Sequence, residues 1–199
     1  MSSNIIAIYW RSYGGLKALL SSPYFYTAIA LSVMLYPQWS QPNWWDLVLS
    51  IMPNLLGFSL GGFAMWIAIG DDDFRKLISG EDDDGKPSPY MEVNAAFVHF
   101  VILQMLALLC ALFAKAYYFV LSPENPLLQI LGDNFYVICM FGNFIGYTIF
   151  IYALLSAIAA TFALLHVTSW YDAAQTQRIK NTPKKKLLPK RSSNNKKNH

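Results

Sequence analysis

The stretch from Trp44 to Lys76 reads WWDLVLSIMPNLLGFSLGGFAMWIAIGDDDFRK and predicts a membrane-spanning helix. No charged residue stands between Asp46 and Asp71, and at about 1.5 Å per residue a helix of that length crosses a hydrocarbon core of about 30 Å. Small, polar or helix-breaking residues nevertheless interrupt the run, and these are Pro53, Asn54, Gly57, Gly61 and Gly62. A helix that served only as an anchor would need none of them. The stretch therefore predicts a membrane-spanning helix that has a function besides anchoring.

The composition of the whole chain also favours a membrane protein. Of its 199 residues, 55% are hydrophobic and only 14% are charged, whereas soluble domains carry about 25% charged residues. The charges are gathered into a few blocks, which leaves long neutral runs between them. The formal net charge of +3 comes from the end of the chain, because residues 178–199 hold nine of the fifteen Lys and Arg residues and no Asp or Glu.

Four apolar runs predict an all-α fold, an integral membrane bundle of four transmembrane helices. Together they form a transmembrane domain at 23–172, with spans at about 23–39, 45–70, 94–121 and 135–168. The first run is short, so we expect its helix to begin near Leu16 and to bend at Pro23. The fourth run would be about 50 Å long as one helix, so it must tilt, kink near Gly142 and Gly146, or continue into the cytoplasm.

The two ends of the chain differ in character from the spans. Residues 1–22 combine aromatic and basic side chains, as a membrane interface does, so we expect an interfacial N-terminal segment with a short helix. Residues 173–199 are basic and of low complexity, and we expect a disordered tail that binds anionic membrane lipids. Lys and Arg occur in the leader, the second loop and the tail but not in the first and third loops. The positive-inside rule therefore places both ends and the second loop in the cytoplasm.

Five polar side chains within the expected spans are candidates for a pore or another polar site: Asn54, His99, Gln104, Lys115 and Asn143. Pro53 and Asn54 predict either a helix kink whose freed backbone carbonyl is hydrogen-bonded or a polar constriction in a conducting pathway. Lys115 is the only charge inside a span, about two turns from its outer end, where it can either snorkel to the headgroups or line an anion-attracting pore. His99 is either a packing residue or part of a proton-sensitive switch.

The glycines of the second span predict close contact between helices. Gly57 and Gly61 follow the G-x-x-x-G spacing, and Gly62 adds a third small residue beside them. This arrangement serves either packing within one bundle or the surface where copies of the chain meet. We expect a homo-oligomer, with the glycines as helix-packing residues.

Two acidic runs follow the second span, and they consist of Asp71, Asp72, Asp73, Asp82, Asp83 and Asp84. They form either a solvated loop or a docking site for a basic cytosolic protein or for the chain's own tail. They do not fit a calcium-binding EF-hand, because Gly80 would stand at the first ligand position. Nucleic acid is not expected as a partner, since the basic tail lacks aromatic interleaving and a nucleic-acid-binding fold.

Signatures of catalysis are absent from the sequence. It contains no nucleophile elbow, P-loop, dinucleotide fingerprint, H-E-x-x-H motif or paired carboxylates within a span. His99 and His166 have no nearby carboxylate in the sequence, so they would make a poor metal site. We therefore expect neither an enzyme nor a cofactor or metal site.

The runs PNLLGFSLGGFAMWIAIGDDDFRKLISG and VNAAFVHFVILQ resemble a family of small, uncharacterised bacterial four-span membrane proteins. The shared pattern is a P-N-L-L-G-F-x-L-G-G stretch, an aspartate-rich exit and an A-x-F-V-H-F motif, over most of residues 10–172. In size and number of spans the chain is also similar to the membrane components of the Kiwa and Hailong anti-phage systems. These resemblances imply an oligomeric, multi-pass protein of the bacterial inner membrane that senses envelope stress or opens a pore.

The sequence leaves two classes of function open. The leading hypothesis is an oligomeric membrane component that conducts ions or perturbs the membrane, as an anti-phage effector would. The mid-span polar and small residues favour it, with the charged cytoplasmic segments available for gating. The competing hypothesis is a non-conducting sensor or anchor that recruits a cytosolic partner through its acidic loop or basic tail.

Overall fold

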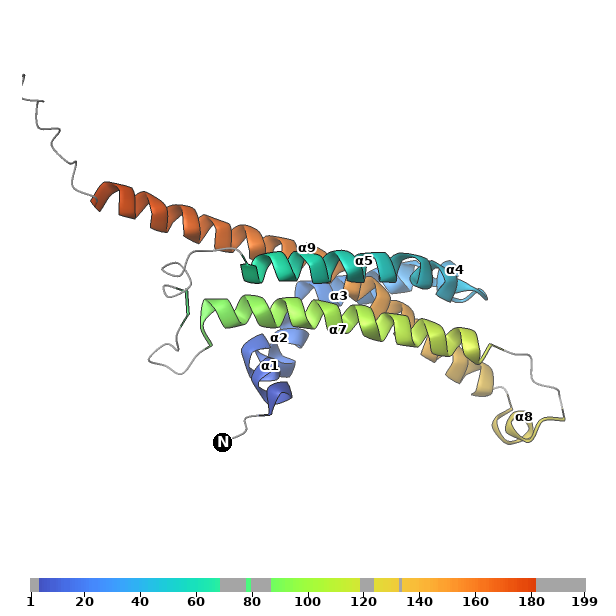
Figure 1. Ribbon diagram of the computed structural model, residues 1–199. Helices are drawn as coiled ribbons and strands as arrows, with labels where there is room; N and C mark the ends of the chain where they lie inside the picture. Colours follow the sequence, from blue (N-terminus) through green and yellow to red (C-terminus); the bar gives the residue numbers. More distant parts are fainter. Residues whose placement is uncertain (1–3, 69–77, 80–86, 119–123, 133, 182–199) are drawn as a thin grey trace, which may run out of the picture.

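Helices form the described part of the chain. The computed structural model describes residues 4–68, 78–79, 87–118, 124–132 and 134–181. Within these ranges every regular element is a helix, and three are long and apolar enough to cross a membrane: α5 (Trp44–Ala68), α7 (Pro89–Ala116) and α9 (Asn134–Asn181). A shorter apolar helix, α3 (Pro23–Met34), joins them. The predicted all-α membrane bundle is therefore confirmed (Figure 1).

The first expected span is divided into short helices. α2 (Gly15–Ser21) ends at Ser22, whose backbone is extended with φ −72° and ψ 122°, and α3 then begins with Pro23. The expected single helix bent at Pro23 is therefore wrong, because a residue before proline avoids the helical region. α3 has 12 residues and is about 18 Å long, and α4 (Tyr36–Trp39) follows after Leu35.

The central helix of the bundle is α7. It packs against both α5 and α9, while α3 packs against α9 and α1 (Ile5–Tyr13) contacts α7 (Figure 1). The short α8 (Pro126–Leu131) contacts α9. Large buried side chains fill these contacts, among them Trp44, Met52 and Phe150. The interior is therefore an apolar core between α3, α5, α7 and α9, into which only a few polar side chains enter.

A glycine on α9 lets an indole ring enter the bundle. A Cβ at Gly146 would lie 3.0 Å from Cη2 of Trp44 and 3.3 Å from Cβ of Cys110, so no larger residue fits without a shift. The sequence singled out Gly142 and Gly146 together as kink positions. A Cβ at Gly142 would meet nothing within 4 Å, so only Gly146 makes a close helix contact in the described chain.

The last helix is much longer than its neighbours. At about 1.5 Å per residue, the 48 residues of α9 measure about 72 Å, and the helix continues past the other helices (Figure 1). Residues 173–181 are helical, so the expected disorder of the tail is wrong for this part. The segment is rich in good helix formers and contains neither Gly nor Pro, and the next proline is Pro183. Residues 182–199 lie outside the described residues.

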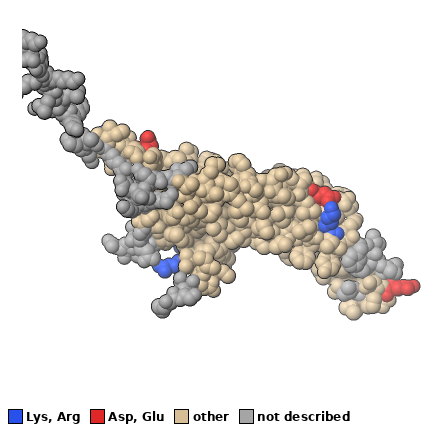
Figure 2. All heavy atoms as spheres, viewed as in Figure 1, with Lys and Arg blue, Asp and Glu red and all other residues tan. Residues whose placement is uncertain are grey.

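Uncharged side chains cover the body of the molecule. In Figure 2 the described Lys, Arg, Asp and Glu side chains lie towards the two ends, and the middle of this face shows none. Large apolar side chains of the long helices are exposed, such as Phe58 at 80% and Phe113 at 62%. A wide apolar band between charged ends is what the hydrocarbon core of a membrane requires. The chain is therefore a membrane protein.

Candidate functional site

An N-terminal arm, formed by α1 and α2, is held on the bundle by aromatic contacts. Gly14 separates the two helices with φ 95°, a left-handed conformation that glycine adopts at little cost. Tyr9 and Tyr13 stand four residues apart on α1, so one helix face presents both. Tyr9 Oη lies 2.7 Å from Nδ1 of His99, and the ring of Tyr13 stacks on the imidazole with centroids 3.9 Å apart. His99 is therefore buried against the arm and only 8% exposed.

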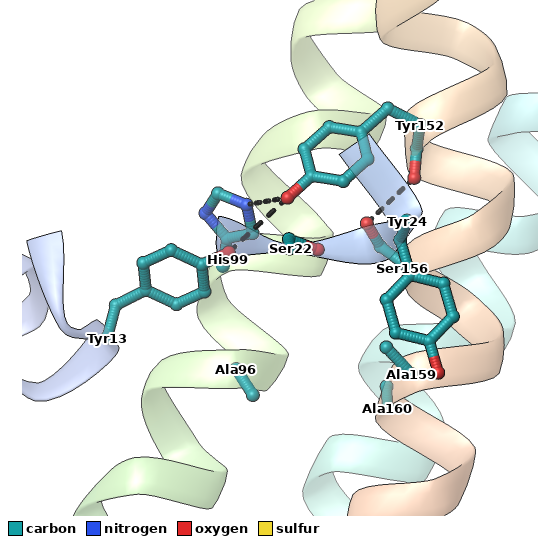
Figure 3. A pocket seen from close by; sticks show the side chains of 9 residues that line it. All are labelled: Tyr13, Ser22, Tyr24, Ala96, His99, Tyr152, Ser156, Ala159 and Ala160. Atoms are coloured by element: carbon teal, nitrogen blue, oxygen red, sulfur yellow. Dashed lines mark hydrogen bonds between the residues drawn. The ribbon is translucent and has the colours of Figure 1, made fainter. Parts of the chain in front are cut away.

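Hydrogen bonds extend from this histidine to α9. His99 Nε2 lies 3.4 Å from Tyr152 Oη, which in turn lies 3.3 Å from Tyr13 Oη (Figure 3). A neutral imidazole has one N–H donor and one acceptor nitrogen, so both of its contacts can be hydrogen bonds to phenols. We call Tyr9, Tyr13, His99 and Tyr152 the tyrosine–histidine cluster. It couples α1, α7 and α9 through neutral polar groups.

The two tyrosines of the arm keep their protons. Burial raises the pKa of the Tyr9 phenol, and the nearby Tyr152 raises it further. Burial also raises the pKa of the Tyr13 phenol, and the hydrogen bond of Tyr13 to Tyr152 raises it further. Both groups therefore act at physiological pH as neutral donors and acceptors, not as acids.

A cavity of about 80 Å³ opens beside the cluster (Figure 3). Besides Tyr13, His99 and Tyr152, small and hydroxyl-bearing side chains line it: Ser22, Tyr24, Ala96, Ser156, Ala159 and Ala160. The alanines come from α7 and α9, and their short side chains leave the space. No lining residue carries a formal charge at neutral pH, which makes this a neutral polar pocket within an apolar bundle.

The polar candidate Gln104 serves helix packing within the chain. It is fully buried, and its Nε2 donates to Ser59 Oγ on α5 at 3.0 Å. Ser59 Oγ in turn lies 2.6 Å from the carbonyl oxygen of Leu55. The amide thus joins α5 to α7 near the middle of both helices and does not line a pathway through one copy.

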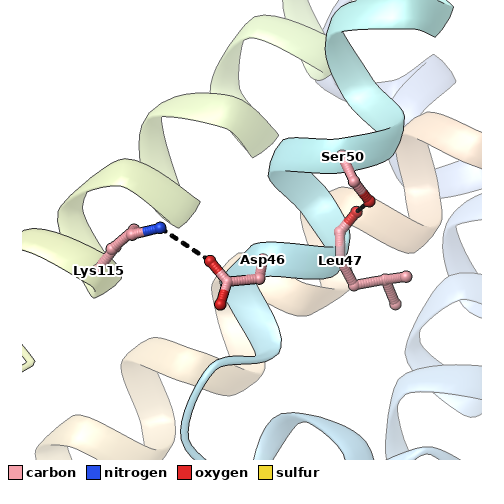
Figure 4. Close-up of polar contacts among 4 residues, drawn as sticks. All are labelled: Asp46, Leu47, Ser50 and Lys115. Atoms are coloured by element: carbon pink, nitrogen blue, oxygen red, sulfur yellow. Dashed lines mark hydrogen bonds and ion pairs between the residues drawn. The ribbon is translucent and has the colours of Figure 1, made fainter.

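The candidate Lys115 lies at a helix end. We expected the third span to continue to 121 and Lys115 to lie about two turns inside it, but α7 ends at Ala116. The expected end of this helix is therefore wrong. Lys115 Nζ lies 2.9 Å from Oδ1 of Asp46 at the start of α5, and both side chains are more than half exposed (Figure 4). This pair closes one end of the α5–α7 contact.

The outward face of α5, which carries Asn54, Gly57 and Gly61, has no neighbour in the described chain. A Cβ built at Gly57, Gly61 or Gly62 would meet nothing within 4 Å, so these glycines do not bring helices of one copy together. Asn54 is exposed, and its Nδ2 donates to the carbonyl oxygen of Ser50 at 3.2 Å. Of the two roles that the sequence left open for the glycines, packing within the bundle is excluded for the described residues.

The five polar candidates therefore do not converge on one site. His99 lies against the arm, and Gln104 and Lys115 each bind a side chain of α5. Asn54 faces outward, and Asn143 is half-buried on α9. The acidic candidates at 71–73 and 82–84 lie outside the described residues. Among the residues that are described, no three His, Cys, Asp or Glu side chains form a group that could hold a metal ion.

Sequence reasoning missed the tyrosines of the cluster. It assigned Tyr9 and Tyr13 to the membrane interface, whereas they contact His99. Their spacing of four residues was the available signal, because it puts two hydroxyls on one helix face. Tyr152 gave a similar signal, since Thr148 and Ser156 stand four residues before and after it, but nothing in the sequence indicated that its partner is His99.

Comparison of the chain with models of protein families, with curated proteins and with solved structures gave no match. The resemblance to a family of bacterial four-span proteins stays a prediction. Function is therefore inferred from the geometry of the chain's own side chains.

Proposed function

We propose that the chain is a homo-oligomeric membrane protein whose copies meet through the outward face of α5 and conduct ions or perturb the membrane at that contact. The observation that carries this proposal is the outward position of Gly57 and Gly61, with no atom of the described residues within 4 Å of an added Cβ. In a membrane, small residues at this spacing allow the backbones of two helices to approach closely.

The same face holds a polar side chain that a lipid tail cannot satisfy. Asn54 stands three residues before Gly57 and seven before Gly61, so all three share one side of the helix. Its carboxamide oxygen would lack a donor in hydrocarbon, whereas a second copy of α5 can supply one. His99, Gln104 and Lys115 have partners within the copy. A conducting pathway would therefore form between copies, with Asn54 at its constriction.

The test separates assembly from conduction. Gly57→Leu and Gly61→Leu should lower the oligomer mass measured by mass photometry in nanodiscs and abolish ion flux in liposomes. Gly142→Leu is the matched control, because Gly142 is also exposed and open but lies on α9. Asn54→Leu should leave the oligomer intact and change the flux. An unchanged oligomer in both α5 variants would refute the proposal.

The alternative, a non-conducting sensor or anchor, is favoured by one observation. α9 continues past the rest of the bundle (Figure 1), and Ile179 near its end is 74% exposed. A helix that projects beyond the bundle offers a surface that a partner protein could contact. If liposome flux stays at background at every ligand and potential tested while the oligomer forms, this alternative replaces conduction.

The proposal also includes a cellular setting, which rests on the family resemblance and on the distribution of Lys and Arg along the chain. We place the protein in a bacterial inner membrane with both ends cytoplasmic, where an effector could depolarise an infected cell. Reporter fusions at each end test the orientation. Phage plating on cells that carry wild-type protein or Gly57→Leu tests defence, and equal plaque numbers on both would remove that role.

A further inference from the structure

We propose that the cavity beside the tyrosine–histidine cluster binds the head of a neutral, membrane-dissolved molecule that carries hydrogen-bond-accepting oxygens. A quinone and a diacylglycerol both present this chemistry, with ring carbonyls in the first case and ester carbonyls in the second. The site is separate from the outward face of α5, so it does not depend on the proposed function.

The donors of the cavity point to an uncharged ligand with acceptor oxygens. Ser22 and Tyr24 line the cavity, and their hydroxyls make no hydrogen bond to the described part of the chain. His99, Tyr152 and Ser156 are already bonded, so the two free hydroxyls are the groups left to bind a ligand. No lining residue carries a formal charge at neutral pH, so a phosphate group would find no counter-charge there.

The size of the cavity requires a ligand that is only partly enclosed. An apolar cavity of about 150 Å³ encloses a whole benzene molecule, and this one has about 80 Å³. Only a small polar head therefore fits, and the remainder must lie outside in the lipid. A small neutral head on an apolar tail is the shape of both proposed ligand classes.

The depth of the cavity suits a ligand that arrives through the bilayer. Gln104 marks the middle of the α5–α7 contact, and His99 and Ala96 precede it on α7 by five and eight residues. At about 1.5 Å per residue the cavity lies about 8–12 Å from that level. A hydrocarbon core of about 30 Å that is centred on the level of Gln104 would include this depth within one half. A molecule dissolved in the tails therefore reaches the cavity without crossing the headgroups.

Native mass spectrometry of the purified full-length protein tests the proposal, with ubiquinone-1 and dioctanoylglycerol as the two probes. We expect one of them to bind at one molecule per chain. Ala159→Leu fills the half-buried edge of the cavity and should weaken binding at least tenfold. Ala30→Leu makes the same change at an exposed position of α3 and should bind as wild type does.

A second variant keeps the test independent of packing. Tyr24→Phe retains the ring and removes a free donor, so it should weaken binding by about fivefold, as the loss of one hydrogen bond does. Binding of ubiquinone-1 alone would identify the quinone class, and binding of dioctanoylglycerol alone would identify the lipid. The proposal is overturned if neither binds, if Ala159→Leu binds as tightly as wild type, or if dioctanoyl phosphatidic acid binds equally well.

Discussion

The contact of α7 with the N-terminal arm and the outward face of α5 carry similar residues but use them differently. At the first, His99 bonds tyrosines from two other helices. At the second, Asn54 donates to a carbonyl of its own helix, and a Cβ at Gly57 would meet nothing within 4 Å in the described part of the chain. Polar and small residues that face inward thus stabilise one copy, while those that face outward remain available to another molecule. What decides the role is the direction in which a residue faces, not its type.

The largest difference in stability is expected between substitutions at a packed glycine, Gly146, and at an open glycine, Gly57. Gly146→Leu should destabilise the fold by about 3 kcal/mol, because its Cβ alone would lie 3.0 Å from the Trp44 ring. Gly57→Leu should leave the stability of one copy unchanged within about 0.5 kcal/mol, since that site is open. Thermal unfolding in detergent, at a concentration where the protein is monomeric, measures both. Equal losses of stability would show that the two glycines do not differ in their surroundings.

The second prediction concerns pH and the N-terminal arm. The pKa values of Tyr9 and Tyr13 are raised where the arm is docked, so the docked state holds these protons more tightly than the free arm does. Docking is therefore fully stable below the ordinary tyrosine pKa of about 10 and weakens above it, by up to tenfold per pH unit for each group.

Ultraviolet titration of tyrosinate measures this effect. Tyr13→Phe should leave the early part of the titration curve unchanged, because Tyr13 does not ionise there. A loss of early amplitude in Tyr13→Phe would contradict the docked geometry.

The sequence predicted the apolar helices well because their signal is local. A run without charge must be buried in protein or lipid, and its length alone indicates a span. The break at Ser22 could also be foreseen as a helix boundary from the following proline. Continuation of the fourth helix was one of the alternatives that its length left open, but the helix at residues 173–181 was missed because the basic residues of the tail were weighed above the helix propensity of this segment.

The candidate site was harder to predict because it depends on how helices face one another. Gln104 looked like a pore residue until Ser59 was found opposite it, and nothing in either run fixes that register. His99 was selected from the sequence, but its partners Tyr9 and Tyr152 are 90 and 53 residues away in the chain. One sequence shows which residues are polar, whereas pairing across helices requires the tertiary structure.

A smaller effect should follow from removal of one hydroxyl in the cluster. Tyr9→Phe keeps the ring and loses the 2.7 Å contact with His99, so arm docking should weaken by about 1 kcal/mol, or about fivefold. Hydrogen exchange of the amides in α1 should rise by the same factor. Tyr26→Phe, an exposed position on α3, serves as the control and should leave that exchange unchanged. Unchanged exchange in Tyr9→Phe would mean that stacking alone holds the arm.

The smallest effect is expected at the ion pair between Lys115 and Asp46. Both side chains are more than half exposed, at 56% and 53%, so water and salt screen their attraction. Lys115→Met should change the free energy of unfolding by less than about 0.5 kcal/mol. Ion flux should remain as in wild type, because Lys115 lies at the helix end and away from the outward face of α5. Thermal unfolding at low and high salt measures the first quantity, and liposome flux measures the second. A large loss of anion flux in Lys115→Met would place this lysine in a conducting pathway and would contradict the distinction between inward and outward polar residues.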